Sequence, residues 1–134
     1  LGKLQLRQGR PAEALPLLEE AVELARRYAG TDSLNALAAM AGLGEAQAAT
    51  GALAEAKNTL DEMEGHVEQH FGRDHLLYAI AQLSQARRLA AAGDKARALK
   101  RLDAADAVLK PIGAQAGTYT PQVAALRAEL LAAP

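Results

Sequence analysis

Residues 51–56 read GALAEA, and two similar segments lie at equal distances on either side. Residues 9–14 read GRPAEA and residues 93–98 read GDKARA. The three segments begin at residues 9, 51 and 93, so the spacing is 42 residues each time. Further pairs or triplets in the same register are Leu18, Leu60 and Leu102, Leu1 and Leu43, Gly2 and Gly44, Gly30 and Gly72, and Asp32 and Asp74. A fixed interval of this kind is typical of proteins built from repeated structural units.

Each unit is predicted to contain two amphipathic helices. In the first unit, apolar residues recur at steps of three and four, which places them on one helical face. These residues are Ala14, Leu18, Ala21, Val22, Ala25 and Tyr28. Gly30 can adopt the left-handed conformation that ends a helix, and Asp32 or Ser33 can cap the next one. Gly72 with Asp74 predicts the same punctuation one unit later.

The pattern predicts an all-α protein. The expected helices lie near residues 1–8, 11–29, 33–50, 53–71, 75–92, 95–112 and 120–133. The last linker, residues 113–117, departs from the glycine and aspartate pattern, but Thr120 before Pro121 still predicts a cap and a first-turn proline. A helix pair cannot bury both of its apolar faces alone, so consecutive pairs must stack into a solenoid with a curved surface.

Glycines in the middle unit carry two further expectations. Gly44 is expected to face Ala56, so that the two helices of this unit pack at short distance. Gly42 and Gly65 lie inside predicted helices, where each glycine costs about 1 kcal/mol relative to alanine. The middle unit is therefore expected to be softer than its neighbours.

The repeat resembles the tetratricopeptide repeat, which places a leucine and a small residue in the first helix, glycine at the turn and alanines in the second helix. The matching residues are Leu43, Gly44, Gly51, Ala56 and Leu60 in one unit, Leu1, Gly2, Gly9, Ala14, Leu18 and Ala21 in another, and Gly93, Ala98, Leu102 and Ala105 in the third, which has Gln85 and Ala86 at the first pair. The resemblance implies a right-handed α-α superhelix of about three helical hairpins plus a C-terminal helix. Its repeat units are expected at about residues 1–32, 33–74 and 75–117, with the terminal helix at 118–134.

The repeat length and the linker at residues 72–75 are similar to the longer variant found in kinesin light chains and many bacterial proteins. The light-chain type usually shows paired asparagines in the first helix, and this chain has Ala41 with Gly42 and Leu83 with Ser84 instead. Members that clamp a partner's terminal carboxylate use lysine, arginine and asparagine. The comparable positions here are Lys3, Glu45 and Arg87, so no carboxylate clamp is expected.

Composition excludes several classes of function. The 134 residues carry 15 basic and 16 acidic side chains, a net charge of −1, so no strong field attracts nucleic acid or an anionic membrane surface. The chain has no cysteine and no apolar run long enough to span a bilayer, so we expect a cytoplasmic protein without disulfides. Because the chain opens at Leu1 inside a helical pattern, residues 1–134 are interpreted as a single domain from a longer protein.

Candidates for chemistry are weak. His66 and His70 lie four residues apart near His75, but no cysteine or third ligand accompanies them, so no metal site or cofactor is predicted. The acidic side chains Asp61, Glu62 and Glu64 are interpreted as a solvated helix face, and no catalytic residue is proposed. The arginine pairs at residues 26–27 and 87–88 are interpreted as ordinary surface charge. The aromatic residues Tyr28, Phe71, Tyr78 and Tyr119 are expected to fill gaps between repeats.

The favoured hypothesis is a non-enzymatic scaffold that binds a protein or peptide on its concave surface. The residues expected to line that surface, at positions that packing constrains least, are Lys3, Arg7, Ala38, Glu45, Ile80, Leu83 and Arg87. The alternative is a regulatory or sensor segment of a larger bacterial kinase or transcription regulator whose curvature responds to a ligand. Exposed apolar residues of the terminal helices, with Leu1 and Leu4 at one end and Leu130 at the other, also suggest a homodimer.

Overall fold

The computed structural model describes residues 10–30 and 33–132 and contains, over those ranges, α-helices, one 3₁₀ helix and no strand. The elements are α2 (Pro11–Ala29), α3 (Leu34–Ala49), α4 (Leu53–His70), α5 (Leu76–Ala91), α6 (Lys95–Ile112), η1 (Gly113–Ala116) and α7 (Thr120–Ala132). The predicted helices from residue 11 onward are confirmed, with ends that agree to within one residue. The helix predicted at residues 1–8 lies outside the described residues, and η1 occupies the linker that breaks the repeat pattern.

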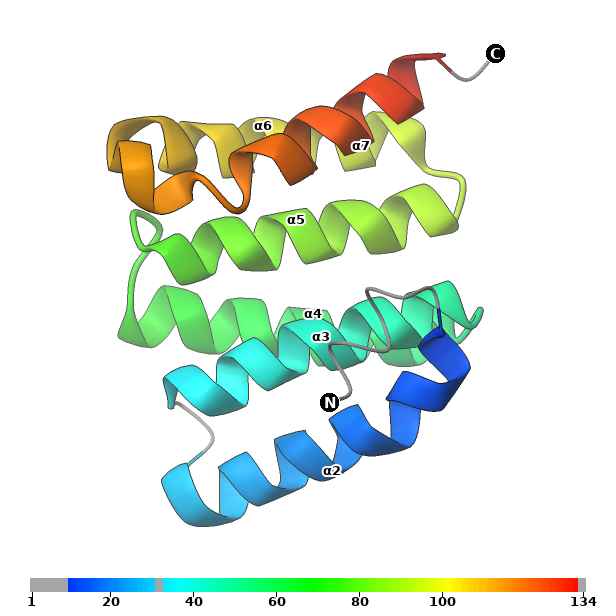
Figure 1. The fold of residues 1–134 in the computed structure, drawn as a ribbon, viewed down its shortest axis with the longest axis vertical. Coiled ribbons are helices and arrows are strands. Elements are labelled where there is room, and N and C mark those ends of the chain that lie inside the picture. The colour runs from blue at the N-terminus through cyan, green and yellow to red at the C-terminus, as the bar shows by residue number, and fades with distance from the viewer. Residues whose placement is uncertain (1–9, 31–32, 133–134) are drawn as a thin grey trace.

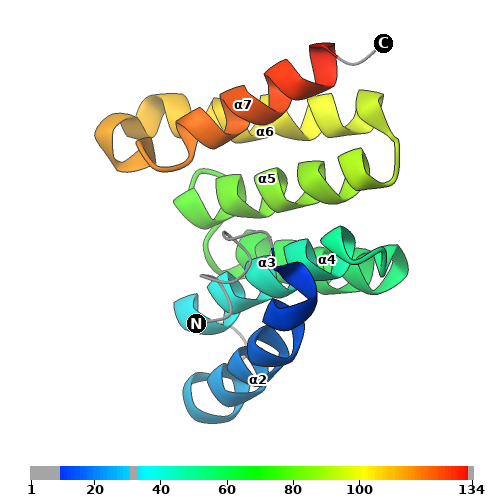
Figure 2. The ribbon, with the colours of Figure 1, turned by 45° about the vertical axis from the view of Figure 1, so that its right-hand side comes forward.

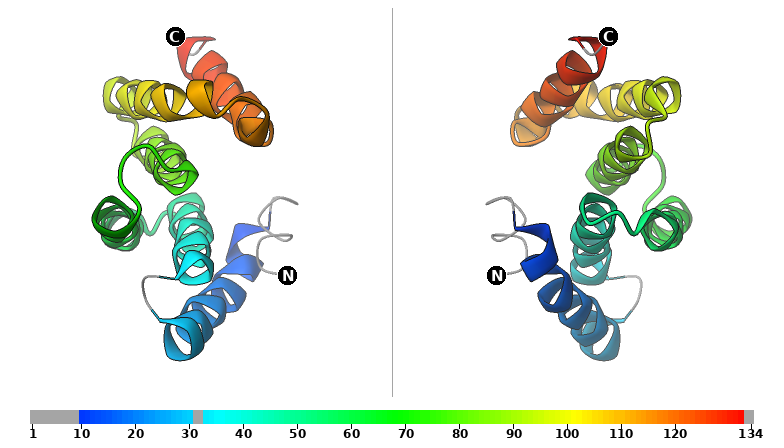
Figure 3. Two further views of the ribbon diagram at one scale, coloured as in Figure 1. Left: turned by 90° about the vertical axis from the view of Figure 1, so that its left-hand side faces the viewer. Right: turned by 90° about the vertical axis from the view of Figure 1, so that its right-hand side faces the viewer.

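The helices stack in chain order as a helical-hairpin solenoid, from α2 at one end to α6 and α7 at the other (Figures 1 and 2). Each helix packs against the next one in sequence, and α3 also packs against α5, which in turn reaches α7. Viewed along the stack's side, α3 and α5 follow one another through its middle, with α4 displaced to one side (Figure 3). The predicted fold class is therefore confirmed.

A glycine with positive φ follows each of the helices α2 to α6. These residues are Gly30, Gly51, Gly72, Gly93 and Gly113, with φ between 70° and 91°. Only glycine adopts this backbone region without strain, so the regular spacing of these residues in the sequence sets where each helix ends.

Helix starts are capped as predicted in one unit and differently in the next. Ser33 caps α3, its Oγ accepting a hydrogen bond from the Ala36 amide at 3.1 Å. At α5, the predicted cap Asp74 is wrong, because the helix begins one residue later. His75 takes the N-cap position, and its Nδ1 accepts from the Leu77 amide at 3.0 Å. The imidazole nitrogen thus caps α5 as the serine hydroxyl caps α3 one repeat earlier.

Two apolar clusters form the core. The first joins α2, α3, α4 and the start of α5, and the second joins the rest of α5 with α6, η1 and α7. Phe71, Tyr78 and Tyr119 pack partly against these clusters, as expected. Tyr28 is 79% exposed, so its predicted place on the buried face of α2 is wrong. It lies in the last turn of that helix, beyond the buried Val22.

Close packing of α3 on α4 occurs at Gly44, where the nearest side chain is that of Leu60. A Cβ atom added to Gly44 would lie 2.4 Å from Cγ and Cδ2 of Leu60. Leu60 is fully buried and sits one turn further along α4 than Ala56. The glycine therefore provides the space that a leucine side chain fills, which fixes how closely this hairpin closes.

Candidate functional site

A groove with a volume of about 620 Å³ runs along α3 and α5 to the start of α7. Most of its lining is apolar and small, and a few polar groups interrupt it. The lining residues are Ala38, Ala41, Gly42, Glu45, Ala48, Ala49, Ile80, Leu83, Arg87, Ala91, Tyr119 and Gln122. A concave, mainly apolar surface with a few directed polar groups has the chemistry of a ligand-binding site.

Five of the seven residues predicted for the concave surface line this groove: Ala38, Glu45, Ile80, Leu83 and Arg87. The other two, Lys3 and Arg7, lie outside the described residues. The expectation that packing constrains these positions least is wrong for Leu83, which is only 2% exposed. Leu83 belongs to the second core cluster, so it forms the floor of the groove and supports the helix at the same time.

A row of hydrogen bonds crosses the groove from α3 through α5 to α7. The Arg87 guanidinium contacts the Glu45 carboxylate through Nη1 at 2.8 Å and donates through Nη2 to the Gln122 amide oxygen at 2.7 Å. The Ser84 hydroxyl also donates to Glu45, at 2.8 Å. Glu45 and Arg87 are 42 residues apart, so they occupy equivalent positions on α3 and α5, and the stacking of consecutive repeats brings these opposite charges together.

Seven lining residues were not predicted from the sequence. Several of them are repeat partners of predicted residues or of one another, since Ala41 precedes Leu83 by 42 residues, Gln122 follows Ile80 by 42, and Ala49 and Ala91 form another such pair. Applying the 42-residue shift to each predicted position would have found Ala41, Ala49 and Gln122. Tyr119 is predicted to pack between repeats. It packs partly against the second cluster and also lines the groove.

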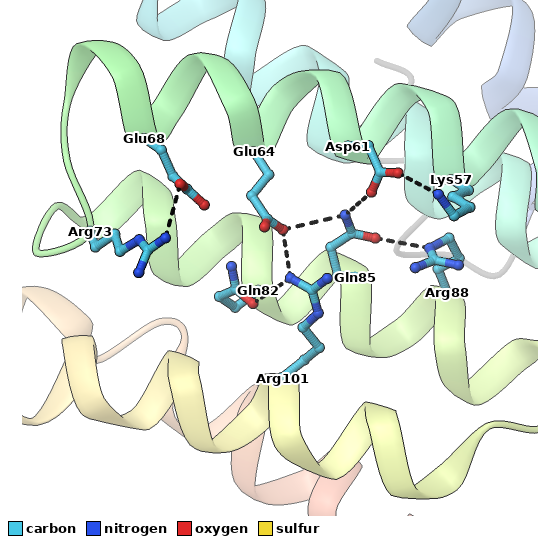
Figure 4. Close-up of polar contacts among 9 residues, drawn as sticks. All are labelled: Lys57, Asp61, Glu64, Glu68, Arg73, Gln82, Gln85, Arg88 and Arg101. Carbon is cyan, nitrogen blue, oxygen red and sulfur yellow. Dashed lines mark hydrogen bonds and ion pairs between the residues drawn. The ribbon is translucent and has the colours of Figure 1, made fainter.

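On α4, α5 and α6 the structure shows a polar network that the sequence did not predict (Figure 4). Gln85 is fully buried and donates through Nε2 to Asp61 at 2.8 Å and to Glu64 at 3.4 Å. Arg88 donates through Nε to the Gln85 amide oxygen at 2.9 Å. Arg101 donates through Nη1 to Glu64 at 2.7 Å. These contacts join three helices and add to the apolar clusters that pack the same helices together.

This network corrects two expectations about surface charge. Glu64 does not lie on a solvated face, since its side chain is only 19% exposed and is paired with Arg101. Asp61 and Glu62 are exposed as expected, although Glu62 pairs with Arg26 at 2.9 Å. Arg88 is not ordinary surface charge, because it is only 9% exposed. A buried guanidinium is tolerated here because the Gln85 amide oxygen accepts from its Nε and the charges of Asp61 and Glu64 favour its ionised form.

The pKa of Asp61 follows from this setting. Burial raises the pKa of this carboxyl, but the hydrogen bonds from Lys57 and Gln85, with the charges of Lys57 and Arg88, outweigh burial and hold the pKa below its usual 3.8. Burial lowers the pKa of Arg88 most, Asp61 raises it, and Arg101 lowers it further. The site therefore favours an ionised Asp61, while burial acts against the charged form of Arg88.

The same geometry recurs one repeat later with an arginine. Arg127 on α7 contacts Asp103 at 2.7 Å and also pairs with Asp106, both on α6. Subtracting 42 from these three positions gives Gln85, Asp61 and Glu64. A residue in the first helix of a hairpin therefore bridges two acidic residues of the preceding helix in both places.

The histidines occupy structural positions. The rings of His66 and His70 stack with centroids 6.2 Å apart, and His75 packs against Phe71 while it caps α5. Within residues 10–30 and 33–132, no group of three histidine, cysteine or acidic side chains is placed to hold a metal ion. In the same ranges, no helix is both long and apolar enough to cross a membrane.

Comparison with known proteins assigns a family to the first part of the chain. The family model described as tetratricopeptide repeat matches residues 1–62. No curated protein and no solved structure matches the chain. The matched range includes α2, α3 and the first half of α4, and the helical-hairpin stacking continues beyond it through α5 and α6. Residues 1–62 therefore match the tetratricopeptide repeat, and the helical-hairpin stacking of the described residues is consistent with a repeat of this kind.

Proposed function

We propose that the protein is a scaffold that binds a peptide segment of a partner protein in the groove along α3, α5 and α7. Tetratricopeptide repeats are generally non-catalytic protein-interaction scaffolds, which is consistent with this assignment. The single observation that carries it is the groove itself, because five residues predicted from repeat position to face a partner line one continuous surface.

The lining indicates what the peptide looks like. Small side chains such as Ala41, Ala48 and Ala49 leave room for apolar side chains of a ligand, and Ile80 with Leu83 provides a larger apolar contact. Between them, Arg87 is held by Glu45 and Gln122, so its charge is already compensated. We therefore expect a peptide with apolar side chains that also hydrogen-bonds to this row, in preference to a strongly acidic one.

Two exposed alanines allow the groove to be blocked without disturbing the core. Ala49 and Ala91 line the groove at the ends of α3 and α5, and both are exposed. Tyrosine at these positions would fill the groove. Peptides selected from a displayed random library on the unmodified protein should lose at least about tenfold in affinity for the Ala49→Tyr/Ala91→Tyr variant, as measured by fluorescence anisotropy.

The control is a second pair of alanines with the same 42-residue relation. Ala54 and Ala96 are exposed on α4 and α6 and do not line the groove. The Ala54→Tyr/Ala96→Tyr variant should bind the selected peptides as the unmodified protein does. Equal binding by both double variants, or selection of no peptide by a correctly folded protein, would contradict the proposal.

Self-association, the kinesin-light-chain-like variety, the cytoplasmic location and the bacterial sensor role stay predictions. For a homodimer, the C-terminal residue to consider is Leu131, which is 63% exposed, whereas the predicted Leu130 packs partly against the second cluster. Sedimentation of Leu131→Glu against the unmodified protein over a range of concentrations tests this interface. The sensor role requires a catalytic or DNA-binding domain in the full-length gene product.

A further inference from the structure

A second, smaller pocket lies between α4, α5 and α6 and shares only α5 with the groove. Its volume is about 290 Å³. Its lining residues are Lys57, Asp61, Arg88, Leu89, Arg97, Lys100 and Arg101. Five of these seven side chains are cationic and one is acidic, although the whole chain has a net charge of −1. The positive charge is therefore local to this pocket.

Arg88 is the unusual member of this set. The residue is only 9% exposed, and its one hydrogen bond among the described residues runs from Nε to Gln85. Within the described part of the chain, no hydrogen bond or ion pair engages its two terminal nitrogens, and Arg88 lines the pocket. A largely buried guanidinium thus presents two donors to the pocket in a planar fork, the geometry that fits two oxygen atoms of one anion.

The ion pairs leave two positive charges uncompensated. Lys57 pairs with Asp61 at 2.7 Å, and Arg101 pairs with Glu64 at 2.7 Å. Arg97 pairs with Asp94 at 3.5 Å. In the described residues no carboxylate pairs directly with Arg88 or Lys100, so the five cations and three acids leave an excess of two positive charges.

We propose that this pocket binds a phosphate monoester group, held by the Arg88 fork with Lys100 and Arg97 at the rim. A phosphate monoester carries a charge of about −1.5 to −2 at pH 7 and three acceptor oxygens, which matches the excess charge and the free donors. A single carboxylate would compensate only half of that charge. Asp61 faces the same pocket, but Lys57 and Gln85 already hold its two oxygens.

Burial also lowers the pKa of Arg88, and the neighbouring charges of Arg101 and Arg97 add to this, while Asp61 and Glu64 oppose it. A bound dianion would favour the charged form of Arg88. The phosphate group can belong to a small metabolite or to a phosphorylated side chain of a protein, since the chemistry that the pocket reads is the same for both.

The test is a titration of the full chain at constant ionic strength, followed by amide chemical shifts in ¹H–¹⁵N spectra. Inorganic phosphate is the first probe and chloride the reference. Phosphate should give saturable shifts confined to residues of α4, α5 and α6 around the pocket. A phosphoserine peptide and its unphosphorylated form are the second pair of probes. Binding of the phosphopeptide tighter than inorganic phosphate indicates a protein source, and equal binding indicates a small-molecule source.

Two lysines on α6 provide a matched pair of variants. Lys100 lines the pocket and Lys110 lies on the same helix outside it, and both are exposed without an ion-pair partner in the described residues. Lys100→Gln should weaken phosphate binding about threefold to fivefold, and Lys110→Gln should leave it unchanged. Arg88→Gln should abolish saturable binding, with its fold checked by circular dichroism.

Shifts that chloride reproduces at equal ionic strength would overturn the proposal, as would equal phosphate affinity in the Lys100→Gln and Lys110→Gln variants. The groove provides an internal comparison. The Ala49→Tyr/Ala91→Tyr variant should bind phosphate like the unmodified protein, so the phosphate pocket and the peptide groove can fail independently.

Discussion

Helices α3 and α5 occupy equivalent places in consecutive repeats and are buried at nearly the same positions, yet their chemistry differs. Eight buried positions coincide when 42 is added to the numbers in α3. In α3 these positions hold only apolar residues and glycine, whereas in α5 four of them hold polar side chains. The four pairs are Met40 and Gln82, Gly42 and Ser84, Leu43 and Gln85, and Ala46 and Arg88.

The difference teaches that repeat position determines burial, while the neighbouring helices determine which side chains can be buried. Gln85 is stable in a leucine position because Asp61 and Glu64 of α4 accept hydrogen bonds from its Nε2. Ser84 is stable in a glycine position because its hydroxyl donates to Glu45. These four residues, Gln82, Ser84, Gln85 and Arg88, form a polar layer in α5. Among the atoms of this layer that solvent does not reach, Nε2 of Gln82 has no hydrogen-bond partner in the described residues. The polar layer is therefore nearly, but not fully, satisfied.

The largest expected effect on stability is at Gly44 of α3, where α3 packs closely on α4. Ala86 takes the corresponding place in α5, so alanine is tolerated there but not in α3. A Gly44→Ala substitution would force the buried Leu60 to move, because the new Cβ would lie 2.4 Å from its side chain. We expect a loss of about 2–3 kcal/mol in the free energy of unfolding, measured by urea denaturation.

Gly65 is the control for that substitution. It lies on an exposed surface of α4, where an added Cβ meets nothing within 4 Å. Gly65→Ala should stabilise the protein by about 1 kcal/mol, because alanine has the higher helix propensity. If the two glycine substitutions shift stability in the same direction, the close packing at Leu60 does not limit the hairpin.

The next largest effect concerns Gln85, which can be converted to the leucine of the preceding repeat. Gln85→Leu should destabilise the protein by about 1–2 kcal/mol, because the buried Nε of Arg88 loses its only hydrogen-bond acceptor. Arg88→Ala removes that donor, and the double variant reproduces Leu43 and Ala46 of α3. Urea denaturation of the two single variants and the double variant gives the coupling between them.

We expect the double variant to be clearly less destabilised than the sum of the two single variants, since it leaves no orphaned donor. Additive effects would mean that Gln85 and Arg88 are independent, and the description of α5 as a connected polar layer would be wrong. Leu43→Gln in α3 provides the opposite comparison. It should destabilise the protein, because the position equivalent to Glu64 in α2 is the apolar Val22.

The smallest effect is a change in titration at Asp61. Because the folded-state pKa of this carboxyl is below 3.8, its contribution to stability is present above pH 3.8 and is lost as the pH falls through the folded-state pKa. In Gln85→Leu, one of the hydrogen bonds that lower the pKa is removed while burial still raises it. NMR titration should show a higher pKa for Asp61 in the variant. An unchanged value would show that Lys57 and Arg88 set this pKa without Gln85.

The sequence predicted the helices closely because each end coincides with a local signal that needs no tertiary information. The glycines at the turns and Ser33 act within a few residues of themselves. The features that the sequence did not predict are long-range. The close approach of Leu60 to Gly44 depends on the offset between two helices, and the burial of Arg88 depends on Gln85 and on the α4 carboxylates of Asp61 and Glu64. Such pairings become visible only when the helices are placed side by side.

For the candidate site, repeat position was the useful signal. It places Glu45 and Arg87 in equivalent positions, and the structure brings these two side chains together at 2.8 Å. The second pocket was missed because its arginines and lysines are scattered between residues 57 and 101 and look like ordinary surface charge. Only the stacking of α4, α5 and α6 gathers them.

The polar layer of α5 also bears on how the chain avoids assembling out of order. Identical hairpins could skip a neighbour during folding, since each would cover any other equally well. If α5 packed on α2 in place of α4, the positions facing Gln85 would be Glu19 and Val22, so one of the two acceptors would be missing. Such a misassembled chain would bury Gln85 and Arg88 with fewer partners, and that penalty selects the correct neighbour during folding.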